Sequence, residues 1–152
     1  MDVPDTVREA LETQVLDHEP GQAALVVRNA VESSGAAAVA GGLLDAAAIA
    51  LRMMVAETDE AYDQAQLVQR LAMDGAVPAD NLEVLGTMLV LAASTAGGIR
   101  PSVDSVIADL GPDRALFGAW LTVLAVVRIV SLTLERTEAD IVEELTAALT
   151  SF

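Results

Sequence analysis

Residues 117–134 read FGAWLTVLAVVRIVSLTL, and Arg128 is the only charged residue among them. The segment is too long for an ordinary strand. Pro112 stands shortly before it, at a place where a first helical turn tolerates proline. We therefore expect a helix over about residues 113–135, apolar on nearly every side. Such a helix is buried in a core or spans a membrane.

A second segment of this kind covers residues 36–56, where Asp45 and Arg52 interrupt the apolar run. A charged side chain is costly inside lipid, and Arg128 interrupts the first segment in the same way. The mean hydropathy of +0.48 is high, yet these charges favour two central helices of a water-soluble bundle. We expect no membrane span.

The rest of the chain carries helix signals at regular intervals and no sustained strand-like alternation. Capping residues, glycine breaks and prolines mark the helix boundaries. The sequence therefore predicts an all-α fold, a compact bundle of seven or eight helices in one domain covering residues 1–152. The expected helices cover about residues 5–17, 22–33, 36–56, 58–73, from 80 to the break at Gly97, 102–110, 113–135, and from Thr137 onward.

Two of these helices allow more specific expectations. Thr6 and Glu9 have the spacing of a capping box at the start of the first helix. Thr137 with Asp140 opens the last helix, whose apolar residues form a narrow stripe. We expect this stripe to dock on the domain, and the alternative is that it is offered to a partner.

The two halves of the chain share an order of elements. Gly35 and Gly111 are 76 residues apart, and Arg52 and Arg128 are separated by the same interval. This spacing is typical of an internal duplication with units of about 1–76 and 77–152. Two fused four-helix units related by a pseudo-twofold axis would result. The alternative is coincidence, because helix–glycine–helix order is common.

The charge is strongly negative, with 23 acidic residues, 8 basic residues and a formal net charge of −15. All the basic residues are arginine. Such a chain repels phosphates and anionic membrane surfaces, which argues against direct nucleic-acid binding. The partners that remain are basic proteins, cations or a second copy of the chain.

Asp45, Arg52 and Arg128 are the candidate site residues. Asp45 precedes Arg52 by two helical turns, and a guanidinium buried among apolar helices must be paired. One interpretation is an interior anion or ligand site held by Arg52 or Arg128. The others are a structural ion pair with Asp45, or arginine head groups that reach solvent.

The sequence gives little support for catalysis, metal binding or cofactor binding. The chain has no cysteine, which excludes disulfides and thiol catalysis. Its single histidine, His18, falls in a turn with Pro20 and Gly21, where we expect a surface side chain. A di-iron helical site would need two histidines. We expect no metal site and no cofactor, and no catalytic motif is recognisable.

These observations leave three functional hypotheses. The leading one is a non-enzymatic, cytoplasmic protein–protein interaction module that binds protein or itself as a homo-oligomer. The second is an acidic decoy that occupies the basic groove of a nucleic-acid-binding protein or toxin. The third is a small-molecule-binding helical bundle with an interior arginine anion site.

Overall fold

The computed structural model describes residues 2–58, 87–88, 91–92, 95 and 103–149. Every element in these ranges is helical, so the prediction of an all-α fold is confirmed. The expected helix over 58–73 and most of the one from 80 onward lie outside the described residues. The elements are α1 (Val3–Leu11), the π-helix η1 (Glu12–Leu16), α2 (Pro20–Ser34), α3 (Ala36–Thr58), α6 (Val103–Leu110), α7 (Pro112–Leu134) and α8 (Glu138–Leu149).

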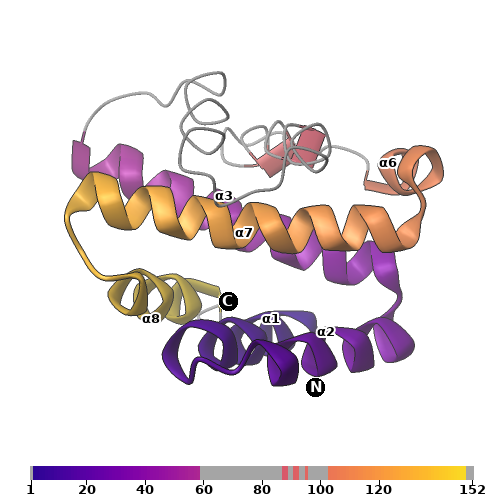
Figure 1. Ribbon diagram of the computed structural model, residues 1–152. Coiled ribbons are helices and arrows are strands. Elements are labelled where there is room, and N and C mark those ends of the chain that lie inside the picture. Colours follow the sequence, from indigo (N-terminus) through magenta and orange to yellow (C-terminus); the bar gives the residue numbers. More distant parts are fainter. Residues whose placement is uncertain (1, 59–86, 89–90, 93–94, 96–102, 150–152) are drawn as a thin grey trace.

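The two apolar helices α3 and α7 cross at the centre and make the most extensive helix–helix contact among the described elements (Figure 1). Both begin at the same end of the molecule. The helices α1, α2 and α8 lie on one side of this pair, and α6 lies on the other. Helices α1, α2 and α8 thus cover one side of the central pair, and α6 packs near the end where both long helices begin.

Small side chains let the helices of this core approach closely. Leu43 and Leu51 of α3 and Val123 of α7 are fully buried. Between them lie alanines with no exposed surface, which allow close backbone packing without voids. These alanines are Ala46, Ala47 and Ala50 of α3, with Ala115 and Ala119 of α7.

Helix α8 docks on the domain, as expected. The Thr137 hydroxyl accepts a hydrogen bond from the Asp140 backbone N–H at 3.1 Å, which caps the first turn. Ile141 and Leu145 have no exposed surface, and Leu149 is 6% exposed. The apolar stripe of the last helix is therefore part of the core.

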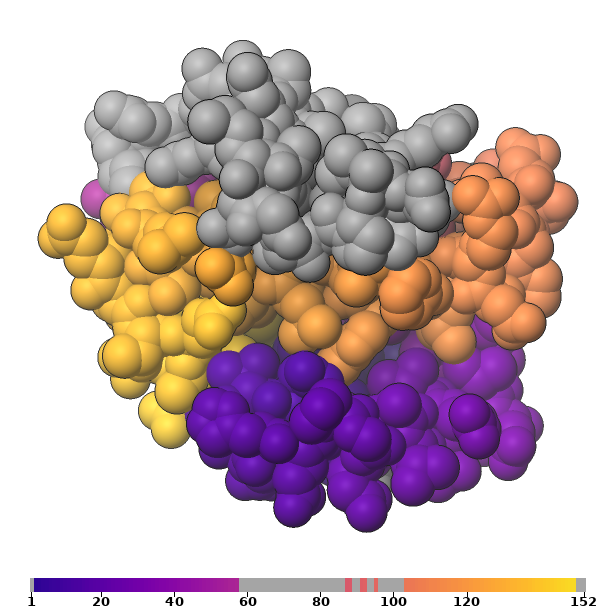
Figure 2. Space-filling view, viewed as in Figure 1, coloured from indigo at the N-terminus to yellow at the C-terminus, as the bar shows by residue number. Residues whose placement is uncertain are grey.

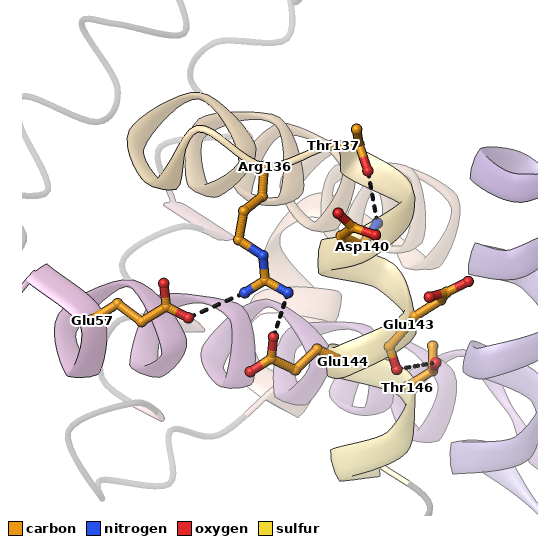
Figure 3. Close-up of polar contacts among 7 residues, drawn as sticks. All are labelled: Glu57, Arg136, Thr137, Asp140, Glu143, Glu144 and Thr146. Atoms are coloured by element: carbon orange, nitrogen blue, oxygen red, sulfur yellow. Dashed lines mark hydrogen bonds and ion pairs between the residues drawn. The ribbon is translucent and has the colours of Figure 1, made fainter.

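Arg136, in the connection between α7 and α8, ties these helices to the end of α3 (Figure 3). Its Nη1 lies 3.1 Å from Glu57 Oε1, and its Nη2 lies 2.7 Å from Glu144 Oε2. The hydrogen bond to Glu144 raises the pKa of Arg136 above its ordinary value, although partial desolvation opposes it. The guanidinium therefore remains charged and can pair with both carboxylates.

The N-terminal helix differs from the expected one at both ends. It begins at Val3, because the Asp2 side chain accepts a hydrogen bond from Asp5 N–H at 3.0 Å. The capping box expected at Thr6 does not form, and the Thr6 hydroxyl donates to Asp2 O instead. Beyond Leu11 the helix widens into η1, where Asp17 N–H reaches back five residues to Glu12 O.

Both long helices are long and apolar enough to cross a membrane by length and composition alone. The candidate spans are Ala36–Glu57 and Pro112–Leu134. In their most apolar windows, 56% and 61% of the residues are buried within the fold. Core helices of soluble proteins pass the same test, so it does not establish where the protein resides.

The turns before the two long helices have the same backbone conformation. Gly35 has a φ of 91° and a ψ of 155°, and Gly111 has a φ of 88° and a ψ of 150°. Each glycine N–H donates to the carbonyl four residues earlier, Val31 O at 2.9 Å and Ile107 O at 2.8 Å. Because φ is positive at both positions, glycine is strongly favoured there.

Gly41 and Gly42 within α3 give a matched test of the packing between α1 and α3. A Cβ on Gly42 would clash with Val3 and lie 3.3 Å from Val7 Cγ2, whereas a Cβ on Gly41 would meet no atom within 4 Å. Gly41→Ala should stabilise the fold by up to about 1 kcal/mol through helix propensity. Gly42→Ala should be less stable than Gly41→Ala by about 1–3 kcal/mol, because it overpacks the α1–α3 contact. Urea unfolding of both variants measures the difference, and equal stabilities would contradict the contact.

Candidate functional site

All three side chains that the sequence singled out lie at the surface. Asp45, Arg52 and Arg128 are exposed. Arg52 donates from Nη2 to Thr95 O at 3.0 Å. Among the interpretations that the sequence left open, this exposure agrees with arginines whose long apolar stems carry the head groups from the helix surface to solvent.

The structure does not gather these three residues into one site. Arg128 lines a surface pocket together with His18. Asp45 and Arg52 line neither that pocket nor the groove described next. Of the three predicted residues, Arg128 therefore lines one of these two cavities.

An apolar groove of about 280 Å³ lies between α2 and α7; we call it the aromatic groove. Each helix contributes one stripe of side chains at helical spacing. The lining residues are Ala24, Val27, Arg28 and Val31 of α2, with Asp113, Leu116, Phe117 and Trp120 of α7. Phe117 is 51% exposed, and Trp120 is half-buried.

The aromatic groove is close to neutral in a protein that is strongly negative. Among the described residues that line it, Arg28 and Asp113 are the only charged ones, and they carry opposite charges. Both are exposed. An uncharged apolar partner surface could therefore bind here without the repulsion that the rest of the surface would exert on an acidic molecule.

A second pocket of about 340 Å³ lies where η1, α7 and the start of α8 meet; we call it the His18 pocket. Figure 2 shows the surface of α7 reaching solvent between the N-terminal helices and α8. The pocket is lined by Gln14, Val15, His18, Leu121, Leu124, Ala125, Val127, Arg128 and Glu138. Apolar side chains form most of its wall.

Sequence reasoning missed the His18 pocket, although one signal for it was present. Leu121, Leu124 and Arg128 have the spacing of one helix face, so a basic group and apolar groups were predictable neighbours. The approach of His18 to that face was not predictable, because it depends on the π-helix before it. His18 is exposed as expected, but it also belongs to a cavity.

The described residues hold no cluster of metal-binding side chains. Within these ranges, no three or more histidine, aspartate and glutamate side chains lie close enough together to hold a metal ion. The described lining residues of the two cavities offer apolar contacts, hydrogen-bonding groups and charges.

No protein-family model, curated protein or solved structure matches this chain. The described residues define the protein by its fold, as an all-helical protein built around two crossed apolar helices.

Proposed function

We propose that this protein is a non-enzymatic, cytoplasmic interaction module that binds a second copy of itself through the aromatic groove. The single observation that carries this proposal is the exposed Phe117 beside Trp120 in an otherwise apolar groove. Aromatic side chains of this kind supply much of the binding energy of protein interfaces.

A partner explains why these side chains face water. Leaving a large apolar side chain exposed forgoes about 1.5–3 kcal/mol of burial energy. Phe117 is 51% exposed, so burial against another molecule could recover roughly half of this energy. Contiguous apolar grooves on soluble proteins mark interaction sites more often than isolated apolar residues do.

A second copy of the chain fits the charges of the groove. In a twofold contact each surface meets itself, so Arg28 of one copy can face Asp113 of the other and the reverse. The remaining surface is strongly acidic, with a net charge of −15 for the whole chain. Like charges on the two copies therefore oppose the contact outside the groove.

This balance gives the self-association an unusual salt dependence. Added salt screens the repulsion between acidic surfaces, so the dimer should become tighter as the salt concentration rises. An acidic decoy bound to a basic protein would behave in the opposite way, because salt weakens attraction between opposite charges.

Sedimentation equilibrium of the full chain at low and high salt tests the proposal. We expect a monomer–dimer equilibrium whose dissociation constant falls with added salt. A chain that remains monomeric at every protein and salt concentration would overturn the proposal. A dimer that dissociates as salt rises would also overturn it, since charge pairs would then hold the copies together.

We also propose that the complete chain is a bundle of seven or eight helices made of two four-helix units with pseudo-twofold symmetry. The support is that α3 and α7 have the same length and begin 76 residues apart, after glycines of matching conformation. In addition, α2 and α6 approach the common end of the central pair from opposite sides (Figure 1). An experimental structure in which one rotation superposes α2–α3 on α6–α7 would support it, and failure of that superposition would refute it.

A further inference from the structure

We infer that the second copy binds with its α7 antiparallel over α2, so that Arg28 of each copy faces Asp113 of the other. The inference rests on the proposed self-association through the aromatic groove, and it specifies which surfaces meet. It depends on the spacing of the lining residues, the size of their side chains and the placement of the two charges.

The two walls of the aromatic groove have lining residues of identical spacing. On each helix they occupy positions i, i+3, i+4 and i+7, which form one helix face over two turns. They are Ala24, Val27, Arg28 and Val31 on α2, and Asp113, Leu116, Phe117 and Trp120 on α7. Each wall is thus a single helix face, the kind of surface that packs against another helix.

Within one copy these two walls are open to a partner. Helix α2 packs mainly on α1 and α3, whereas α7 packs mainly on α3. Ala24, Arg28, Asp113 and Phe117 are all exposed. Arg28 and Asp113 form no ion pair with any residue that the structure describes. Both charges are therefore available to groups on another molecule.

The walls differ in the size of their side chains. Helix α7 supplies the bulky aromatic residues Phe117 and Trp120, whereas the apolar residues on the α2 wall are alanine and valine. Large side chains set against small ones fill the space between two helices. The α2 wall is therefore a better match for the α7 wall of a second copy than for another α2 wall.

The two charges are divided between the walls in the same way. Arg28 belongs to α2 and Asp113 belongs to α7. Contact between α2 and the α7 of a second copy sets opposite charges against each other, whereas contact between two copies of one helix sets like charges together at a cost. A twofold axis that runs along the groove brings each α2 onto the other copy's α7, so both halves of the interface satisfy size and charge together.

The direction of the helices sets the register of this contact. Helix α2 ends just before α3, at the end of the molecule where α7 begins, so α2 and α7 run in opposite directions (Figure 1). Rotation about an axis along the groove keeps this antiparallel sense between the copies. Ala24 lies four residues before Arg28, and Phe117 lies four residues after Asp113. The register that pairs the charges therefore also sets a small side chain opposite the exposed phenyl ring.

Charge reversals test the register, because each one changes two contacts of a twofold interface. Arg28→Glu sets two carboxylates against each other at both contacts, and Asp113→Arg does the same with two guanidinium groups. Each variant should dimerise at least about tenfold more weakly than the unaltered chain. Sedimentation equilibrium of the full chain at about 0.15 M salt measures the change, since charges within about 8 Å still interact there. Thermal unfolding establishes that both variants are folded.

An equimolar mixture of the two variants separates contact between copies from effects within one copy. Each variant has two like charges in its own groove, whereas a heterodimer sets a carboxylate against an arginine at both contacts. The mixture should therefore dimerise within about threefold of the unaltered chain. Native mass spectrometry should show that the dimer in the mixture is the heterodimer.

Arg8→Glu and Asp109→Arg are the matched controls. They change the net charge of the chain in the same two directions, both residues are exposed, and neither lines the aromatic groove. Each control variant, and their mixture, should dimerise within about threefold of the unaltered chain, because distant surface charges are largely screened. Losses in the controls as large as those in Arg28→Glu and Asp113→Arg would contradict the inferred contact.

Two further results would overturn the inference and leave self-association in place. In one, the unaltered chain dimerises and neither reversal weakens it, so the copies meet in another register. In the other, both reversals weaken the dimer and the mixture does not recover, so the two charges do not face each other. An unaltered chain that remains monomeric would instead overturn the proposed function, and the inference with it.

Discussion

Leu43→Ala is expected to lower the free energy of unfolding by about 2–5 kcal/mol. Leu43 has no exposed surface and lies in the core cluster to which α1, α2, α3, α7 and α8 contribute. The surrounding alanines are too small to fill the space that the leucine would leave. Because a domain has a total stability of only about 5–15 kcal/mol, this variant should be close to unfolding.

Urea unfolding followed by circular dichroism measures the effect. Leu132→Ala provides the matched control, since Leu132 is 62% exposed on α7. The same substitution there should change the stability by no more than about 0.5 kcal/mol. Similar losses in both variants would mean that the apolar helices are not packed in the way the structure describes.

Phe117→Ala is expected to weaken self-association by about thirtyfold or more, the consequence of losing an interface residue worth at least about 2 kcal/mol. Phe117 is half exposed in the monomer, so its removal should leave the fold nearly as stable as before. The effect should therefore be visible in the dissociation constant and absent from the melting temperature.

Leu132→Ala again supplies the comparison, because Leu132 is an exposed apolar residue of α7 outside the aromatic groove. Sedimentation equilibrium should give this variant the dissociation constant of the unaltered protein. A dimer weakened by Leu132→Ala and unaffected by Phe117→Ala would move the interface to the other end of α7.

Those parts of the fold with strong local signals were predictable from the sequence. The long helices were expected over 36–56 and 113–135, and they run over Ala36–Thr58 and Pro112–Leu134. Glycine and proline set their starts, and a continuous apolar run sets their length. The cap at Thr137 followed in the same way, from a hydroxyl three residues before Asp140.

The features that the sequence did not predict depend on competition between neighbouring capping residues or on contacts between distant parts of the chain. At the N-terminus the sequence predicted a cap at Thr6, whereas Asp2, four residues earlier, forms it. The π-helix η1 has no marker in the sequence. Nor did the interval between Asp45 and Arg52 indicate that both side chains reach the surface, because exposure depends on which helices cover α3.

The exposure of the aromatic groove could not be predicted from the sequence either. Phe117 and Trp120 were evident in the sequence as part of an apolar run and were expected to be buried within the bundle. Phe117 is instead half exposed, since the helices that pack on α7 leave the face towards α2 open. A periodic pattern predicts which residues share a face, but it does not predict which face remains uncovered.

The aromatic groove and the His18 pocket exist only if α3 and α7 pack against each other in water. High-speed centrifugation of a detergent-free lysate of cells producing the full chain tests this most directly. The protein should stay in the supernatant and elute from a sizing column as a helical monomer or dimer. Recovery in the membrane pellet, with release by detergent alone, would contradict it and make Ala36–Glu57 and Pro112–Leu134 membrane spans.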